Sequence, residues 1–133
     1  MKTILFLILM SATIGISAQH FELVGKTYAD VEKVYNGKVI DFHSESDTVT
    51  IKYTACDSRF LAVGFIIIRD SVQLMAIWCK DRNSGLEKYV SKLMTKQGFK
   101  YYSLGFWRRE KDSLSFWIDR DSTKQMVVFY KYK

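Results

Sequence analysis

Two apolar runs lie near the middle of the chain, in residues 60–79, and the polar triplet Arg69-Asp70-Ser71 separates them. Residues 65–68 contain no polar residue, so both faces of that strand are expected to be covered. The polar triplet predicts a tight turn with Asp70 and Ser71 as its two central residues. The pattern therefore predicts a β-hairpin at the centre of a sheet.

Other segments also show the two-residue period of strands. Residues 39–42 and 49–53 predict two strands, and the second places Val49, Ile51 and Tyr53 on one face. Residues 21–24 predict a short edge strand. Residues 99–107, 114–118 and 124–132 predict three more strands, the first with a bulge or bend at Gly105. Asp-Thr or Asp-Ser pairs at 47–48, 70–71, 112–113 and 121–122 predict turns, since their spacing fits no calcium loop.

A period of 3.6 residues predicts two helices. The first begins at Thr27, which forms a capping-box-like pair with Asp30, and it ends at residues 36–37, Asn-Gly. The second covers residues 84–98, with Ser84 and Glu87 as a capping box. Its apolar face consists of Leu86, Tyr89, Val90, Leu93 and Met94.

These elements predict an α+β fold, in which a meander-like antiparallel sheet of about six to seven strands packs against two α-helices. The order helix, strand, turn, strand occurs twice along the chain. This order agrees with a tandem helix-plus-meander duplication and equally with an ordinary α+β domain. A division into two smaller helix-plus-meander halves is the alternative architecture.

The first eighteen residues have the layout of a secretory signal peptide, with Lys2 at the start, an apolar run at residues 4–10 and small residues up to Ala18. A membrane-spanning helix needs about 20 apolar residues, so cleavage is favoured over an uncleaved anchor. We therefore expect residues 1–18 to be removed. Residues 19–133 are then expected to form one domain of an exported protein, periplasmic or extracellular, with no membrane span.

The chain contains 20 Lys and Arg against 14 Asp and Glu, and loss of Lys2 leaves 19 against 14, a net charge of +5. This excess favours anionic surfaces as partners, although an ordinary solvated basic surface also accounts for it. Aromatic residues near Arg108, Arg109 and Arg120 are of the kind that binds single-stranded nucleic acid. Strand alternation divides these aromatic residues between two faces, and export argues against that partner. No nucleic acid is therefore predicted as a ligand.

Two cysteines, Cys56 and Cys79, remain after removal of the signal peptide. In an oxidising compartment such a pair is usually bridged, and the disulfide would stabilise the fold by about 3 kcal/mol. The expected hairpin register places Cys79 opposite Ala62, so a bridge requires residues 55–59 to fold back over the sheet. The alternative is two thiols, with Cys79 filling space in the core.

The sequence contains no recognised catalytic or metal-binding motif. His43 precedes the strand at 49–53 and Cys56 follows it. The two residues are therefore expected to lie about 15 Å or more apart, which disfavours a Cys–His pair. There is no nucleophile elbow and no HExxH motif. With His20 as the only other histidine, neither a metal nor a cofactor is predicted. A small secreted enzyme that uses carboxylates or Cys56 is the alternative function.

The predicted strands at 99–107 and 114–118 carry more aromatic residues than one face of a small core holds. Alternation places Tyr102 and Phe106 on one side and Tyr101 and Trp107 on the other. Aromatic and arginine side chains are enriched at binding hot spots. The first helix and the N-terminal segment could instead cover the second side. We predict a small non-catalytic binding module, of inhibitor, adaptor or envelope-associated type, that binds a protein or glycan through Tyr101, Trp107, Arg108, Arg109 and Trp117.

Overall fold

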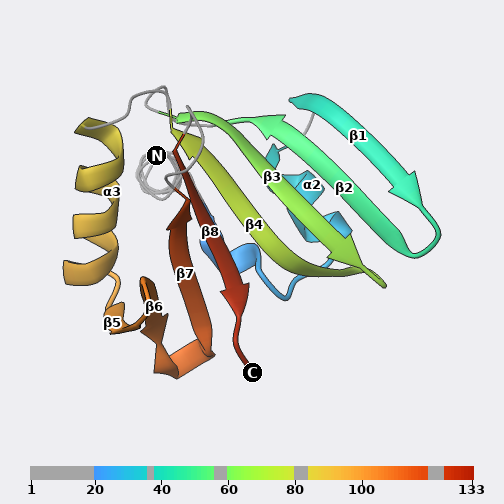
Figure 1. Ribbon diagram of the computed structural model, residues 1–133. Coiled ribbons are helices and arrows are strands. Elements are labelled where there is room, and N and C mark those ends of the chain that lie inside the picture. The colour runs from blue at the N-terminus through green and yellow to red at the C-terminus, as the bar shows by residue number, and fades with distance from the viewer. Residues whose placement is uncertain (1–19, 36–37, 56–59, 80–83, 120–124) are drawn as a thin grey trace, which may run out of the picture.

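The computed structural model describes residues 20–35, 38–55, 60–79, 84–119 and 125–133 (Figure 1). Within them, one antiparallel sheet contains eight strands in the order β1-β2-β3-β4-β8-β7-β6-β5. The strands are β1 (Val39–Glu45), β2 (Thr48–Thr54), β3 (Phe60–Ile68), β4 (Ser71–Cys79), β5 (Lys100–Ser103), β6 (Phe106–Arg109), β7 (Leu114–Asp119) and β8 (Met126–Lys131). The predicted α+β class with two α-helices is confirmed, with slightly more strands than expected.

The strand order divides the chain into two similar halves. Helix α2 (Tyr28–Tyr35) precedes the meander β1 to β4, and helix α3 (Ser84–Thr95) precedes the meander β5 to β8. The last strands of the two meanders, β4 and β8, pair antiparallel from Leu74↔Tyr130 to Trp78↔Met126. Both halves therefore belong to one sheet, and the repeated pattern extends to four strands in each half.

The additional strand arises from residues 99–107, for which one long strand was predicted. The structure divides this segment into β5 and β6, which pair with Tyr101 opposite Trp107. Leu104 and Gly105 connect the two strands with φ angles of 52° and 83°, as in a two-residue hairpin turn. A second prediction was also wrong, because residues 21–23 form the short 3-10 helix η1 (Phe21–Leu23) instead of an edge strand.

The central hairpin of β3 and β4 is confirmed, but its turn differs from the prediction by one residue. Arg69 and Asp70 are the two turn residues, with φ angles of 50° and 59°, and Ile68 pairs with Ser71. The two register shifts within the β3–β4 pair cancel each other, so Cys79 pairs with Phe60, as the observed turn requires. The predicted pairing of Cys79 with Ala62 was therefore wrong, because it assumed a turn at Asp70 and Ser71.

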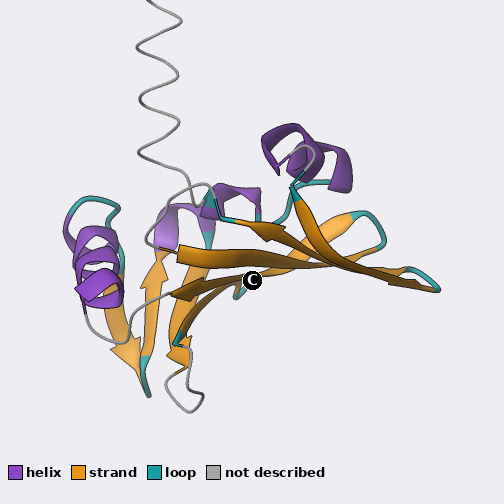
Figure 2. Ribbon diagram, turned by 90° about the horizontal axis from the view of Figure 1, so that it is seen from above, coloured by secondary structure: helices purple, strands orange, loops and turns teal. Residues whose placement is uncertain are grey.

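The two helices and η1 pack on the same face of the sheet (Figure 2). Tyr35 of α2 stacks on Tyr53 of β2 with the ring centroids 5.1 Å apart. Tyr89 of α3 and Phe21 of η1 both contact Phe129 of β8, at 6.5 and 5.1 Å between centroids. The buried aromatic and aliphatic side chains lie between these helices and the sheet, so this face holds the core.

The start of α2 is fixed by local and by tertiary hydrogen bonds. The Thr27 Oγ1 accepts the backbone N–H of Asp30 at 3.3 Å, and the Asp30 carboxylate accepts the backbone N–H of Thr27 at 3.2 Å, which confirms the capping box. Asp70, in the β3–β4 turn, accepts the backbone N–H of Tyr28 at 3.0 Å. The central hairpin therefore also caps the helix that packs behind it.

Several predictions concern residues outside those that the structure describes. They are the signal peptide at residues 1–18, the helix end at residues 36–37, the side chains of the capping box at Ser84 and Glu87, and Cys56. Within the described residues, no helix combines the length and the apolar character that crossing a membrane requires.

Candidate functional site

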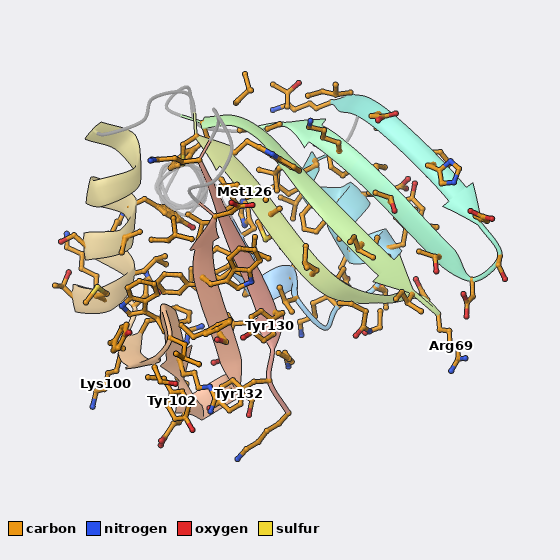
Figure 3. The ribbon with its side chains drawn as sticks, viewed as in Figure 1. Arg69, Lys100, Tyr102, Met126, Tyr130 and Tyr132 are labelled. Carbon is orange, nitrogen blue, oxygen red and sulfur yellow. The ribbon has the colours of Figure 1, made fainter. Side chains whose placement is uncertain are left out.

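The face of the sheet opposite α2 and α3, here called the open face, is not covered by any helix among the described residues. Alternation along β4 directs Leu74, Ala76 and Trp78 to this face, while Met75 and Ile77 enter the core. Figure 3 looks onto the open face and shows Met126 and Tyr130 along β8, with Tyr132 just beyond its end. The face combines aliphatic and aromatic side chains with a basic region at one end.

Arg108 of β6 occupies the basic end of the open face. Its guanidinium carbon lies 3.8 Å from the ring centroid of Tyr102 and 4.2 Å from that of Tyr132. These two cation–π contacts come from β5 and from the residue after β8, so they tie three separate segments together. The Arg108 Nε is buried and has no hydrogen-bond partner in the described structure. This arrangement holds a planar cation in place with an unused donor.

The surrounding surface forms a groove of about 1010 Å³, here called the basic groove. Its lining contains six Lys and Arg side chains and one acidic side chain, Glu110. One of the six, Arg109, is neutralised by an ion pair with Asp112 at 2.7 Å. The other basic lining residues have no carboxylate partner within the described residues: Lys96, Lys100, Arg108, Lys111 and Lys133. The groove is therefore strongly electropositive.

Arg109, next in sequence to Arg108, is held by interactions inside the protein. It is 8% exposed and donates to the Asp112 carboxylate through Nε and Nη2, at 3.1 and 2.7 Å, and to the Gln97 carbonyl at 2.9 Å. Its guanidinium also packs against the rings of Phe21 and Phe99. Burial raises the pKa of the Asp112 carboxyl, but the hydrogen bonds and charge of Arg109 lower this pKa by a larger amount. The net pKa is therefore below its ordinary value.

A second groove of about 410 Å³, here called the apolar groove, crosses the middle of the open face. Its lining is mainly apolar and includes Ile66, Leu74, Ala76, Trp117, Met126 and Val128. Trp78 lies across Gly64, where an added Cβ would come within 2.8 Å of the ring. The Lys52 ammonium lies 4.4 Å from the centroid of the same ring. Trp78 is thus held between the backbone and a cation.

The structure brings only some of the predicted binding residues together. Arg108 and Trp117 both lie on the open face, because Arg108 pairs with Ser115 and Trp117 pairs with Phe106. Trp107 points to the helix side and stacks on Phe116, with centroids 5.0 Å apart and rings nearly parallel. Tyr101 contacts Trp107 at 5.4 Å and, at 59% exposed, also lines the basic groove.

The sequence reasoning missed several residues that the structure places around Arg108. Lys100 lies directly opposite Arg108 in the β5–β6 pair. Tyr102 and Tyr132 supply the two rings that enclose its guanidinium. Recognition of the turn at Leu104 and Gly105 would have placed β5 beside β6, but the pairing of Lys100 with Arg108 also depends on the register shift before Ser103. Tyr132 contacts Arg108 because β8 pairs with β7, and no local sequence pattern predicts that pairing.

The described residues offer little for nucleophilic or metal chemistry. Burial raises the pKa of the Cys79 thiol to about 11, so the reactive thiolate is scarce at neutral pH. Cys79 is 2% exposed, and its predicted disulfide partner Cys56 lies outside the described residues, so the disulfide stays a prediction. His20 contacts Glu22 and His43 contacts Glu45. In the described part of the chain, no three His, Cys, Asp or Glu side chains are grouped to hold a metal ion.

No protein-family model, no curated protein and no solved structure matches this chain. The function is therefore argued from the geometry and charge of the open face.

Proposed function

We propose that this protein is an exported, non-catalytic binding module that binds an anionic partner in the basic groove. The observation that carries the proposal is the placement of Arg108 between Tyr102 and Tyr132, with a buried Nε that has no partner in the described structure. Because that Nε is covered by protein atoms, a ligand would meet the part of the guanidinium that lines the groove and would bring it an acceptor. A carboxylate, phosphate or sulfate oxygen meets that requirement.

The setting of Arg108 lowers the cost of binding such a group. The two tyrosine rings restrict the guanidinium in advance, so less side-chain entropy is lost when a ligand binds. Lys100 lies opposite Arg108, and the other basic side chains of the groove add to the local positive potential. That potential attracts anions and speeds their encounter with the groove.

The sequence predicted a protein or glycan as the partner. An acidic protein segment and an anionic glycan both carry the acceptors that Arg108 requires. An inhibitor, adaptor or envelope-associated role is consistent with such a partner and with the export that residues 1–18 predict. The alternative of a secreted enzyme receives no comparable support from the described residues.

Dextran sulfate, a polyanion of defined composition, provides a direct test. We expect wild-type protein to bind it with an affinity that decreases as salt increases. Arg108→Gln should weaken binding by about tenfold, because a charge-assisted hydrogen bond is lost. Arg69→Gln is the matched control, since Arg69 is an exposed arginine in the β3–β4 turn, far from the groove (Figure 3). Equal losses for the two variants, with both folded, would show that only net charge matters and would overturn the proposal.

A further inference from the structure

The basic groove is lined from both faces of the sheet, and its Tyr102, Arg108 and Tyr132 side chains lie on the open face, which also holds the apolar groove. A cross-strand row runs from Arg108 through Ser115 and Tyr130 to Leu74, which lines the apolar groove. With neighbouring strands about 4.8 Å apart, three steps separate Arg108 from Leu74 by about 14 Å. One ligand of moderate length therefore reaches both grooves.

The described residues of the row between the two grooves carry no charge. Tyr130 and Phe106 contact each other with ring centroids 6.3 Å apart, and Phe106 pairs with Trp117 of the apolar groove. Ser115, the remaining residue of the row, is fully buried and donates its hydroxyl to the Trp107 carbonyl at 2.9 Å. The path from Arg108 to the apolar groove is thus mainly aromatic, and the Ser115 hydroxyl within it is already hydrogen-bonded.

The lining of the apolar groove favours a hydrocarbon chain over a sugar. Ile66, Leu74, Val128 and Met126 supply aliphatic contacts and no hydrogen-bonding groups. A sugar ring would need an open aromatic face with hydrogen-bonding groups beside it. Lys52 covers the ring of Trp78, and the aliphatic side chains that share the lining with Trp117 offer no hydrogen bond. The polar residues Asp41, His43 and Thr50 are confined to the β1–β2 side of the groove.

We infer that the ligand of the basic groove is an anionic amphiphile, with its phosphate, carboxylate or sulfate group at Arg108 and its alkyl or acyl chain in the apolar groove. This inference rests on the proposed function and specifies its ligand. Charge complementarity fixes the orientation, because the basic side chains of the two grooves are concentrated at the Arg108 end. A free phosphate would leave the apolar groove unused, and a neutral amphiphile would leave Arg108 without its acceptor.

Binding of n-decyl, n-dodecyl and n-tetradecyl phosphate, whose chains are long enough to extend from Arg108 into the apolar groove, tests the inference by calorimetry below the micelle concentration of each. Each fully buried methylene strengthens binding about fourfold. An open groove covers a chain about halfway, so tetradecyl phosphate should bind about 15-fold more tightly than decyl phosphate. Inorganic phosphate and n-decyl glucoside, which carry only one of the two features, should bind more weakly than decyl phosphate.

Two variants in β3 test whether the alkyl chain binds in the apolar groove or elsewhere on the open face. Ile66→Thr places a hydroxyl in the apolar groove and should reduce the dependence on chain length. Ile68→Thr is the matched control, because Ile68 lies on the same face of the same strand but does not line the groove. The control should bind the whole series like the wild type. Arg108→Gln should weaken binding of the phosphates but not of decyl glucoside.

The outcomes distinguish this inference from the proposed function. Affinity that is independent of chain length, or absent for every alkyl phosphate while dextran sulfate binds through Arg108, would overturn the inference and leave the proposed function intact. Equal binding of decyl glucoside and decyl phosphate, unaffected by Arg108→Gln, would overturn both. An equal effect of Ile66→Thr and Ile68→Thr would also overturn the inference, because the chain would then lie elsewhere.

Discussion

The substitution Gly64→Ala tests how the central strands shape the apolar groove. An alanine Cβ at this position would lie 2.8 Å from Cζ3 and 2.9 Å from Cη2 of Trp78. Carbon atoms that are not bonded prefer separations of about 3.5–4.0 Å. Trp78 would therefore have to turn out toward the groove, where it would lose its contact with the sheet and its position 4.4 Å from the Lys52 ammonium.

The expected magnitude follows from two opposing effects. Overpacking of this kind costs roughly 1–3 kcal/mol. Alanine in a strand is more stable than glycine by about 0.5–1 kcal/mol, because glycine loses more backbone entropy on folding. We expect Gly64→Ala to lower the free energy of unfolding by about 1 kcal/mol. The same substitution should also weaken tetradecyl phosphate binding without changing dextran sulfate binding, since only the apolar groove is altered.

Urea denaturation followed by far-ultraviolet circular dichroism measures the effect in wild type and in a Trp78→Leu background. Without the indole ring there is no clash, so Gly64→Ala should stabilise that background by about 0.5–1 kcal/mol. The change of sign between the two backgrounds is the diagnostic result. The same destabilisation in both would show that the clash with Trp78 does not set the cost and would refute the reasoning.

Three further predictions concern the helix side of the molecule. Asp112→Asn should destabilise the fold by about 1–3 kcal/mol, measured by urea denaturation, because buried Arg109 loses its carboxylate partner. The Asp112 pKa is below its ordinary value of 3.8, so the ion pair stabilises the fold fully above that pH. This stabilisation is lost as pH falls through the folded-state pKa, and acid should therefore destabilise wild type more than Asp112→Asn. Thr27→Ala should cost about 1 kcal/mol in thermal or urea unfolding, whereas Thr27→Ser should retain the cap; equal losses would contradict the capping role. Cys79 should resist iodoacetamide at pH 8 under reducing conditions in the folded protein and react in urea, as mass spectrometry would show; rapid reaction in the folded state would contradict its burial.

Periodicity alone was enough to predict the central hairpin and both helices, because each has a strong local pattern. The segment at 99–107 was misread because its turn, Leu104-Gly105, lies between aromatic residues and lacks the Asn or Asp that usually precedes glycine in such turns. The candidate site was only partly predictable. Arg108 was recognised from composition, but its enclosure by Tyr132 depends on strand pairing between distant segments.

The neighbours Arg108 and Arg109 show why composition did not define the site. Because successive side chains of a strand point to opposite faces, the two arginines occupy different chemical environments. Arg109 is committed to Asp112 and the Gln97 carbonyl inside the structure, so its substitution should be read mainly in stability. The Arg108 guanidinium lies between two aromatic rings, and its Nε has no hydrogen-bond partner within the described structure, so its substitution should be read mainly in binding. If Arg108→Gln instead destabilises the fold as much as Arg109→Gln, the stacking with Tyr102 and Tyr132 is structural, and the argument for a ligand at this end of the open face fails.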